Sequence, residues 1–474
     1  MIPITEYAGR DVAIYGLGRT GLAAARALKA GGARVFAWDD GEAARATAEA
    51  EGINVADLNK RDWQKFAALV LSPGIPYTHP QPHRLVRLAQ TMDVPVIGDT
   101  ELFARAVQAL PEKGRPKIIG ITGTNGKSTT TALIGHILKE AGIDARVGGN
   151  IGTGVLDMPP LHANAVYVLE LSSYQLDLTS SLKCDVALFL NISPDHLDRH
   201  GGMDGYVAAK TRIFANQDAR DVAVIGIDDP ITQHLAMGRK RPGQARVVPI
   251  SAEFGLARGV SAVGGYLHDS VSGHAVRVGD LVLADALPGQ HNYQNAAAAY
   301  AACSALGLSA PRIMAGIRSF PGLPHRMERV ADIDGVRFIN DSKATNAQAA
   351  EQALKTYPKV HWIVGGVAKA DGITPLEPFF NRIETAYLIG ESSDAFAKAL
   401  EGKAKVKHCK TLDAATNAAY KAASKSKTQA PVVLLSPACA SFDQFKDFEA
   451  RGDAFRETVK RLEEAATPAQ VATG

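Results

Sequence analysis

Lys117-Ile-Ile-Gly-Ile-Thr-Gly-Thr-Asn-Gly-Lys-Ser-Thr-Thr-Thr131 is the stretch on which the fold of this chain depends. Residues 118–121 are mostly β-branched and predict a buried strand, and residues 128–141 are long enough for a helix. Gly123 and Gly126 lie between them, where glycine allows a tight turn and a close approach to a ligand. Because amide groups at a helix N-terminus attract anions, this turn predicts a phosphate-binding site.

The residues that follow the turn narrow the ligand to a nucleoside triphosphate. Lys127 supplies a positive charge for the outer phosphates, and Ser128 or Thr129 offers a hydroxyl group to Mg²⁺. The usual phosphate-loop pattern has a glycine where this chain has Ile121, so an ordinary strand-to-helix turn with a surface lysine is the alternative. The agreement of strand, glycines, lysine and hydroxyl groups favours the ATP site, although it does not define the reaction.

Length and composition limit the class of protein. A chain of 474 residues predicts about three domains, and a net charge of +3 gives no sign of a nucleic-acid surface. No basic-then-apolar leader or membrane-length apolar run is present, so we expect a soluble, cytoplasmic protein without membrane insertion. The cysteines are too far apart in sequence for a paired zinc or redox motif: Cys184, Cys303, Cys409 and Cys439.

The first hundred residues predict a nucleotide-handling α/β domain. Strands are expected at 11–15 and 34–38, and the first leads into Gly16-Leu-Gly18-Arg-Thr-Gly21 and a helix. Asp39 follows the second strand, where an acidic residue meets a ribose in dinucleotide-binding units. A tight turn in any doubly wound fold explains the glycines equally well, and a dehydrogenase is a more distant alternative.

Other strand ends of the first two domains carry polar groups. The predicted strand 68–71 runs into Ser72-Pro-Gly74, and residues 111–116 are rich in proline, glycine and charge and predict a linker. Residues 148–152 predict a second glycine-rich turn. Glu170 ends the predicted strand 165–169, where a second group for Mg²⁺ is expected, although a carboxylate satisfied at a strand end is the alternative.

Three further positions in the central region have competing interpretations. Two His and two Asp follow the predicted strand 186–190 and form either a metal or proton-transfer cluster or a polar loop: Asp195, His196, Asp198 and His200. We favour His196 in the site. Lys210 by itself would be a solvent-exposed helical lysine. Asn292 and Asn295, three apart at a predicted helix start, either bind a base or ribose or cap the helix.

The last third again alternates strands and helices. Strands are predicted at 336–340, 361–366, 386–389 and 432–435, each followed by small polar or charged residues. In a parallel sheet these residues gather along one edge, where ligands bind. The predicted fold is therefore α/β with three domains: a Rossmann-like domain at 1–113, a central phosphate-loop ATPase domain at 114–321 and a Rossmann-like domain at 322–474.

The motifs together resemble the Mur ligases, ADP-forming amide ligases of peptidoglycan synthesis. Six segments occur in family order: Gly123-Thr-Asn-Gly-Lys-Ser128, Glu170-Leu-Ser-Ser, Asp195-His196, His291-Asn-x-x-Asn295, Pro324-His-Arg326 and Asp341-Ser-Lys-Ala-Thr345. Residues 436–452, Ser-Pro-Ala-Cys-Ala-Ser-Phe-Asp-Gln-Phe-Lys-Asp-Phe-Glu-Ala-Arg-Gly, resemble the members that add D-glutamate. The resemblance covers nearly the whole chain.

The resemblance implies ligation of D-glutamate to UDP-N-acetylmuramoyl-L-alanine through an acyl phosphate, with ATP and two Mg²⁺ ions, by a monomer. It implies catalytic roles for Lys127, His196, Lys210 and Lys343, with Lys210 N-carbamylated. The implied metal-binding residues are Ser128, Glu170, His196 and the Lys210 carbamate. Burial or a nearby cation should lower the pKa of Lys210, since the lysine must lose its proton before it reacts.

The same resemblance assigns three sets of binding residues. ATP would contact Gly123, Thr124, Asn125, Gly126, Lys127, Ser128, Thr129, Asn292, Asn295, Arg326 and Asp341. The UDP-linked substrate would contact Gly18, Arg19, Thr20, Asp39, Ser72, Gly74 and Asn150. D-Glutamate would contact Thr345, Lys369, Ser441, Phe442 and Phe448.

Two alternatives remain at this stage. Another Mur ligase or a folylpolyglutamate synthase would keep the fold and change the amino acid or the acceptor. A nucleotide-binding protein that forms no bond would keep only the fold, but such a protein does not need Glu170, His196, Lys210 and Lys343 together.

Overall fold

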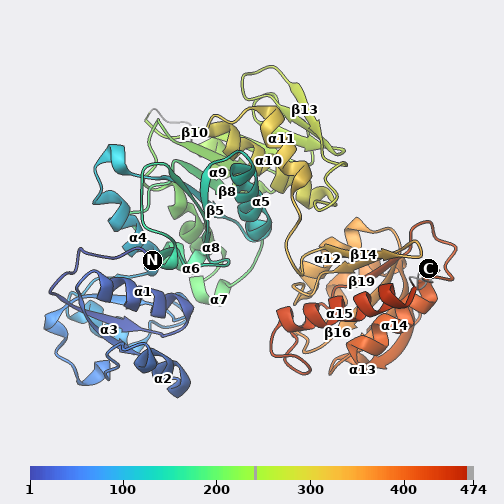
Figure 1. Cartoon of the computed structure of the whole chain (residues 1–474), viewed down its shortest axis with the longest axis horizontal. Coiled ribbons are helices and arrows are strands. Elements are labelled where there is room, and N and C mark those ends of the chain that lie inside the picture. Colours follow the sequence, from blue (N-terminus) through green and yellow to red (C-terminus); the bar gives the residue numbers. More distant parts are fainter. Residues whose placement is uncertain (240–242, 467–474) are drawn as a thin grey trace, which may run out of the picture. The chain divides into compact units, whose positions relative to one another are not determined.

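A computed structural model describes residues 1–239 and 243–466 of the chain. The first sheet is formed by residues near the N-terminus. Its four strands are all parallel, in the order β2-β1-β3-β4, and Figure 1 draws this region in blue. The elements of this region are β1 (Asp11–Tyr15), α1 (Arg19–Ala30), β2 (Arg34–Trp38), α2 (Glu42–Ala50), β3 (Phe66–Leu71), α3 (Arg84–Thr91), β4 (Val96–Ile97) and α4 (Asp99–Gln108).

The central sheet has nine strands in the order β13-β12-β11-β10-β9-β8-β5-β7-β6. Its first elements are β5 (Lys117–Thr122), α5 (Lys127–Glu140), β6 (Asp144–Gly149), β7 (Ala165–Glu170), α6 (Ser173–Asp177), β8 (Val186–Phe189), α7 (Leu197–His200) and α8 (Met203–Thr211). They continue with β9 (Val222–Gly226), α9 (Pro230–Gly238), β10 (Arg246–Ser251), β11 (Val260–Val263), β12 (Tyr266–Asp269), β13 (Val276–Asp280), α10 (Gln290–Ala305) and α11 (Ala310–Ser319). The phosphate-loop strand β5 lies between β7 and β8, well inside this sheet.

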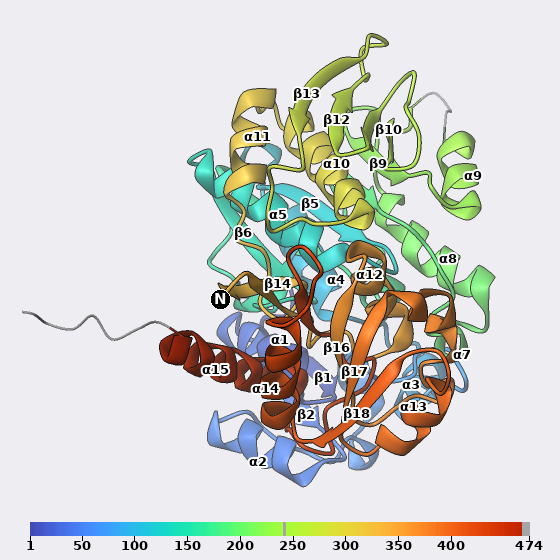
Figure 2. The same cartoon turned by 90° about the vertical axis from the view of Figure 1, so that its right-hand side faces the viewer.

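The third sheet has six strands in the order β14-β15-β19-β16-β17-β18, and every pair is parallel except β14 with β15 (Figure 2). Its elements are β14 (Glu328–Ile333), β15 (Val336–Asn340), α12 (Ala347–Thr356), β16 (Val360–Gly365), β17 (Ile383–Ile389), α13 (Ser393–Ala399), β18 (Lys405–Lys410), α14 (Leu412–Ala423), β19 (Val432–Leu435) and α15 (Phe448–Ala466). The three sheets agree with the predicted α/β class.

The chain separates into two compact units, and we describe each by itself. The first holds residues 1–283 and 292–320, and the second holds residues 284–291 and the chain from Pro321 onward. The first two sheets share one unit because a single apolar core joins them: Leu102 and Phe103 of α4 pack in the same cluster as Tyr167 and Leu169 of β7. The rings of Phe103 and Tyr167 lie 5.2 Å apart.

The predicted strands and helices occur with small shifts at their ends, and the turn expected at residues 148–152 begins two residues later than predicted. Gly148 and Gly149 belong to β6 and pair in parallel with Leu169 and Glu170 of β7. A Cβ atom at Gly148 would come within 2.2 Å of the carbonyl oxygen of Thr153. These glycines therefore serve a close approach of backbones within the sheet, and the turn begins only after them.

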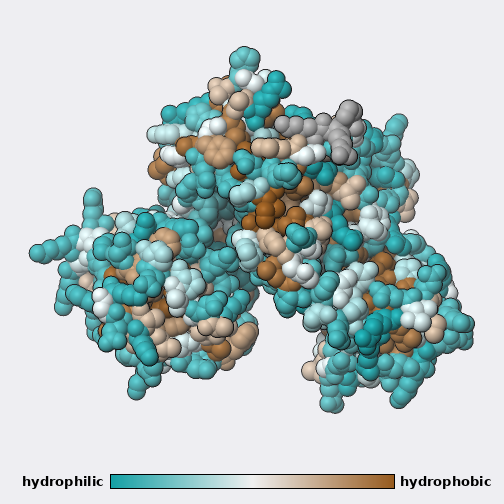
Figure 3. Space-filling model, turned by 180° about the vertical axis from the view of Figure 1, so that it is seen from behind, coloured by the Kyte–Doolittle hydropathy of each residue, from teal (hydrophilic) through white to brown (hydrophobic). Residues whose placement is uncertain are grey.

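The surface is largely hydrophilic on the face shown in Figure 3, and its apolar residues form separate groups. Large exposed apolar side chains include Val276, Val282 and Leu283, in or just after β13. Within residues 1–239 and 243–466, no helix is both long and apolar enough to cross a membrane.

A buried carboxylate fixes α4 to the central domain. Glu101 accepts hydrogen bonds from the backbone amides of Ser180 (2.8 Å) and Ser181 (2.9 Å) and pairs with Arg105 at 2.8 Å. Burial acts to raise the pKa of Glu101, but the hydrogen bonds from Ser181 and Arg105 outweigh it and lower the pKa. The ionised carboxylate is therefore the form that stabilises this contact.

We predict that Glu101→Ala lowers the free energy of unfolding of the first unit by about 3 kcal/mol, because two amides and a guanidinium group lose their buried partner. Urea unfolding followed by circular dichroism measures this loss at pH 7. The exposed Glu49→Ala is the matched control, with an expected change below about 0.5 kcal/mol. Equal effects of the two substitutions would contradict the role given to Glu101.

Candidate active site

The phosphate loop occupies the turn from β5 to α5, as predicted. Gly123 has φ +152° and Gly126 has φ +82°, and Gly126 is the N-terminal cap of α5. A Cβ atom at Gly126 would come within 2.2 Å of Oδ1 of Asn295. Glycine is therefore required here both by the backbone conformation and by the side chain packed against it.

Two lysine ammonium groups converge on one carbonyl oxygen of this loop. Lys127 Nζ donates hydrogen bonds to the carbonyls of Gly123 (2.9 Å) and Thr124 (2.8 Å). Lys210 Nζ donates to the same Gly123 carbonyl at 2.8 Å. The two positive charges thus lie within two hydrogen-bond lengths of each other, in a place that favours a bound anion.

Lys210 is buried, so the interpretation of this residue as a solvent-exposed helical lysine is wrong. Its exposed fraction is 1%, and its ammonium group lies 4.7 Å from the centre of the Tyr206 ring. Burial and the charge of Lys127 hold the pKa of Lys210 well below its usual value. The charges of Asp195 and Glu170 act to raise this pKa, but they do not outweigh burial and the charge of Lys127.

Glu170 provides an unsatisfied buried oxygen at the end of β7. In the sheet, Glu170 pairs with Ile121 of β5, just before the phosphate loop. One carboxylate oxygen, Oε1, accepts a hydrogen bond from Asn150 Nδ2 at 2.8 Å, whereas the buried Oε2 has no hydrogen-bond partner. An orphaned carboxylate oxygen is suited to a divalent cation, so the residues present fit the expected Mg²⁺.

His196 lies on the loop between β8 and α7, and the residue has the left-handed backbone conformation with φ +53°. Its ring lies 5.1 Å from the ring of Tyr174, which also stacks on His200 at 5.4 Å. His200 is buried, and its Nε2 lies at hydrogen-bond distance, 2.9 Å, from Ser173 Oγ.

No group of three or more His, Cys, Asp or Glu side chains able to hold a metal occurs within residues 1–239 and 243–466. The clustering of two His and two Asp after β8 therefore does not make a metal site by itself. Mg²⁺ in proteins is commonly held by one or two carboxylates together with the phosphates of its substrate. Glu170 and the buried Ser128 are compatible with that pattern.

Asn292 and Asn295 of α10 pack against the phosphate loop. Asn295 Oδ1 accepts a hydrogen bond from Thr130 Oγ1 at 3.2 Å, and Asn295 Nδ2 donates to Asn292 Oδ1 at 3.0 Å. Both asparagines are buried, and they lie after the start of α10 at Gln290. The interpretation of these residues as simple helix caps is therefore wrong, and their predicted place beside the nucleotide site agrees with the contact to α5.

Two residues that support the loop were not selected from the sequence. Asn191, directly after β8, accepts the amide of Asn125 at 2.9 Å, and Tyr206 Oη lies 3.2 Å from Thr124 Oγ1. The position of Asn191 at a strand end was a usable signal. Tyr206 lies four residues before Lys210 on one face of α8, which is the second signal.

The first domain places its predicted residues around the turn from β1 to α1. Asp39 accepts the amides of Leu17 (2.6 Å) and Gly41 (2.8 Å), so its carboxylate holds the glycine loop. Ser72 Oγ donates to the carbonyl of Gly16 at 2.8 Å.

The α1 N-terminus also connects this domain with the central one. Gly18 caps α1, and Arg19 and Thr20 begin it. Arg19 donates to the carbonyl of Gly152 at 3.0 Å and more weakly to that of Asn150 at 3.4 Å. The carbonyl of Gly74 accepts a hydrogen bond from Arg199 at 3.0 Å. The N-terminus of α1, the positive charge of Arg19 and the open space at Gly18 and Gly74 make this turn suited to bind an anionic group.

In the second unit, Asp341 is buried at the end of β15. Its oxygens accept the hydroxyl of Ser436 at 2.8 Å and the amide of Met327 at 3.2 Å. Burial raises the pKa of Asp341 to about 7, although those hydrogen bonds and the charge of Arg326 oppose the rise. The structure therefore brings the predicted residues Asp341 and Arg326 into electrostatic contact.

Other predicted residues of the second unit gather at the same edge of the third sheet. The ammonium group of Lys343 lies 3.7 Å from the centre of the Phe448 ring, and the amide of Thr345 donates to the carbonyl of Lys343 at 2.8 Å. Ser441 is buried, whereas Lys369 and Phe442 are exposed, Phe442 by 73%. Val367 and Ala440 form a bridge, which joins the segment before Lys369 to that before Ser441.

Family models match two parts of the chain. Residues 121–303 match the Mur ligase middle domain, and residues 325–439 match the Mur ligase, glutamate ligase domain. Solved structures agree on the fold. UDP-N-acetylmuramate–alanine ligase from Thermotoga maritima covers 96% of this chain and 99% of its own, with a TM-score of 0.57 and 18% identity. MurF ligase from the same organism, solved with ADP, covers 98% of both chains with a TM-score of 0.57 and 16% identity.

Curated relatives match over the full length. The chain is 58% identical to UDP-N-acetylmuramoylalanine–D-glutamate ligase of Caulobacter sp. (strain K31) over 462 residues, 98% of each protein. It is 57% identical to the ligase of the same name from Caulobacter vibrioides over 472 residues, which covers both proteins completely. Two domain models of the Mur ligases match this chain, and relatives of the same family are 57% and 58% identical to it over nearly its full length. The chain therefore belongs to the Mur ligase family.

Proposed function

We propose that this protein joins D-glutamate to UDP-N-acetylmuramoyl-L-alanine in an ATP-dependent, ADP-forming reaction of peptidoglycan synthesis in the cytoplasm. The substrates are those in the name of its full-length relatives, at 57% and 58% identity. The chemistry needs activation, because a carboxylate is a poor electrophile. The γ-phosphoryl group of ATP passes to that carboxylate, ADP leaves, and the amine displaces phosphate from the acyl phosphate.

The convergence of Lys127 and Lys210 on the carbonyl of Gly123 is the observation that carries this proposal. Negative charge spreads over the phosphoryl group during its transfer, and preorganised cations stabilise that charge. Lys127, at the first position of α5, is placed to exchange its loop carbonyls for phosphate oxygens. A protein that only bound a nucleotide would not need a second, buried lysine beside Lys127.

Mg²⁺, when bound, neutralises and orients phosphate oxygens. We assign Glu170 and Ser128 to one ion, because Glu170 offers a buried oxygen with no partner and Ser128 is buried at the start of α5. We assign His196 and a carbamate on Lys210 to the second ion. Asn150 positions Glu170 through its 2.8 Å hydrogen bond.

The burial of Lys210 supports the carbamate. A neutral lysine amine attacks CO₂, a new N–C bond forms, one proton leaves, and the ammonium cation is replaced by an anion. The lowered pKa of Lys210 increases the fraction of neutral amine available for this step. The product anion would also relieve the repulsion between Lys210 and Lys127.

We assign the substrates to the remaining predicted residues. The UDP portion is placed at the glycine turn with Gly18, Arg19, Thr20, Asp39, Ser72 and Gly74. D-Glutamate is placed with Thr345, Lys369, Ser441, Phe442 and Phe448, where Lys369 supplies an exposed cation for its carboxylates. Lys343, which lies beside Phe448, is proposed to contact the reacting phosphate. Arg326 and Asp341 are proposed to contact ATP, and the protein is proposed to act as a monomer.

Phosphate release from ATP in the presence of UDP-N-acetylmuramoyl-L-alanine tests the proposed function. We expect release with D-glutamate and none above background with L-glutamate, L-alanine, L-lysine or diaminopimelate. Release with another amino acid would contradict the D-glutamate assignment while keeping the ligase chemistry. Absence of release with every acceptor, despite ATP binding, would contradict the ligase reaction itself.

We predict that Lys210→Ala lowers kcat at least about 100-fold, since removal of one group that stabilises transferring charge commonly costs that much. Acetate or propionate should restore part of this activity by supplying the missing anion. Lys139→Ala, an exposed lysine at the end of α5, is the control and should keep wild-type activity. Normal activity of Lys210→Ala, or a folded Lys210→Ala variant that no short carboxylate rescues, would exclude the carbamate.

The raised pKa of Asp341 predicts a pH-dependent stability of the second unit. The ordinary pKa is 3.8 and the folded value is about 7, so the folded state holds a proton that the unfolded state has lost between these values. The contribution of Asp341 to stability is therefore most favourable below about pH 4, declines as pH rises and becomes constant above about pH 7. The maximal slope is about 1.4 kcal/mol per pH unit.

Asp341→Asn should remove this decline, so the variant gains stability relative to the wild type between pH 5 and pH 8. Hydrogen–deuterium exchange of peptides from β15 and β19 reports the stability of this unit separately from the first. Exposed Asp371→Asn is the matched control. A constant difference between Asp341→Asn and the wild type across this pH range would show that Asp341 is already ionised at pH 5.

A further inference from the structure

A cavity lies on the side of the central domain away from the phosphate loop. Its volume is about 640 Å³, within the range of small-molecule sites. It is lined by α4, by the linker after α4 and by residues at the starts of β5, β8 and β9. The cavity lies entirely within the first unit.

The direction of the strands separates this cavity from the candidate active site. Lys117 begins β5, and Asp185 and Asp221 immediately precede β8 and β9. The phosphate loop follows the opposite, carboxyl end of β5. A six-residue strand spans about 20 Å, so a ligand here would not touch the ATP site.

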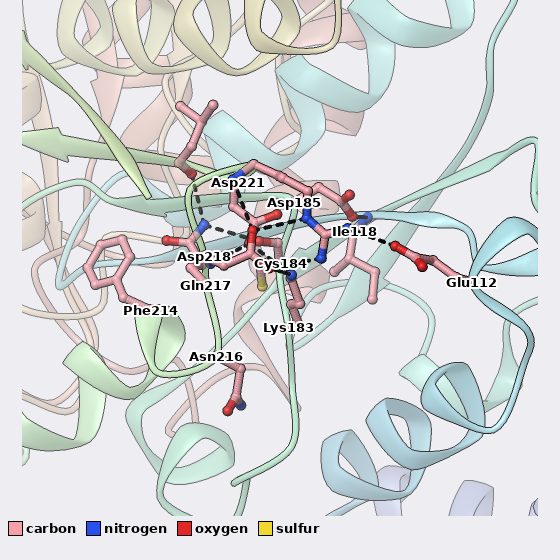
Figure 4. A network of polar contacts seen from close by, with 12 residues as sticks. Glu112, Ile118, Lys183, Cys184, Asp185, Phe214, Asn216, Gln217, Asp218 and Asp221 are labelled. Carbon is pink, nitrogen blue, oxygen red and sulfur yellow. Dashed lines mark hydrogen bonds and ion pairs between the residues drawn. The ribbon is translucent and has the colours of Figure 1, made fainter. Parts of the chain in front are cut away.

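Every carboxylate in the cavity lining is paired with a cation of the same lining. Lys117 pairs with Asp185 at 2.6 Å, and Lys183 pairs with Asp221 at 3.2 Å. Arg220 pairs with Glu112 of the linker at 2.8 Å. Figure 4 shows the part of this network around Lys183, Asp185, Asp221 and Glu112, together with Asp218, which is a further acceptor for both Lys183 and Arg220.

Two cations of the lining remain after these pairs are formed. Lys113 and Arg115 lie on the linker, and in the described chain neither forms an ion pair with a carboxylate. Arg115 is held in place because its guanidinium group donates to the carbonyls of Gln108 (2.7 Å) and Leu110 (2.9 Å) at the end of α4. The lining therefore carries two positive charges that no carboxylate balances, and one of them belongs to the guanidinium group of Arg115, whose position is fixed by its hydrogen bonds.

Three apolar residues also line the cavity. They are Ala104 and Val107 of α4 and Ile118 of β5, and all three are largely buried. An inorganic ion gains nothing from apolar neighbours, whereas the organic part of a ligand gains contact with them. The combination of these residues with two cations that lack a carboxylate partner favours a ligand with a compact organic group and a doubly charged head.

We propose that this cavity, the linker pocket, binds a small organic phosphate monoester as its dianion, with Lys113 and Arg115 on the phosphate and Ala104, Val107 and Ile118 on the organic group. Phosphate suits the two cations because a guanidinium fork and an ammonium group both bind it strongly. The proposal does not depend on the ligase reaction. A ligand in the linker pocket would connect α4 and the linker with the central sheet.

The test is a ¹⁹F NMR titration of the full chain with 4-fluorophenyl phosphate. The phosphate loop is a second place where a phosphate can bind, so Lys127→Ala is titrated in parallel. We expect binding to persist in Lys127→Ala and to weaken at least about tenfold in Lys113→Glu, which reverses one of the two unpaired charges. Lys139→Glu reverses a charge on an exposed lysine elsewhere and should leave the affinity unchanged.

Three results would overturn the proposal. Loss of all binding in Lys127→Ala would leave the phosphate loop as the phosphate site. Unchanged affinity in Lys113→Glu would show that the linker pocket does not hold the dianion. Equal affinity for 4-fluorobenzoate, which has the same apolar body and a single charge, would show that two charges are not recognised. Arg115→Lys keeps the charge while removing the guanidinium fork, and it should weaken binding less than Lys113→Glu.

Discussion

Two ammonium groups donate hydrogen bonds to one carbonyl oxygen, that of Gly123, and the candidate active site depends on this unfavourable arrangement. Like charges held this close repel, and burial of Lys210 increases the cost because water cannot screen it. The fold maintains the arrangement because Lys210 is fixed on α8 and Lys127 on α5, and both helices are anchored in the core. A bound phosphate chain supplies the negative charge that this place lacks.

The parallel register of three strands determines what else surrounds that place. β5 lies between β7 and β8, so Ile121 stands beside Glu170 and Thr122 stands beside Phe189. The phosphate loop, Glu170 with its unpaired Oε2, and Asn191 therefore all lie at the carboxyl ends of these strands, along the same edge of the sheet. Gly126 then admits Asn295 of α10 against the loop, which adds a helix distant in sequence to the same site.

The sequence predicted the parts of this site that depend on local patterns. A glycine turn between a strand and a helix located Gly123, Gly126 and Lys127, and apolar runs located the strand that ends in Glu170. These signals suffice because strand, turn and helix are adjacent in the chain. The family resemblance extended them to Lys210, whose own surroundings in the sequence gave no sign of burial.

Other features could not be predicted locally, since they depend on packing between distant segments. Gly148 and Gly149 looked like a turn, but the backbone of β7 and the carbonyl of Thr153 approach them within a sheet. The asparagines of α10 looked equally like caps, and only their contact with Thr130 of α5 shows which face they occupy. Asp39 was expected to meet a ribose, whereas in the structure its carboxylate already binds two amides of the surrounding loops.

Charge balance distinguishes the linker pocket from the phosphate loop, two of the phosphate-binding places that we assign to this unit. At the phosphate loop, Lys210 lies beside Lys127, and the carbamate proposed for Lys210 would turn their repulsion into attraction before a nucleotide binds. In the linker pocket, three ion pairs satisfy the carboxylates and leave Lys113 and Arg115 of the linker without a carboxylate partner. The phosphate loop is arranged to stabilise the negative charge that spreads over a phosphoryl group during its transfer. The linker pocket is suited only to bind an anion that does not react. This difference follows from burial: Lys210 is buried beside Lys127, while Lys113 is exposed to solvent, which screens its field.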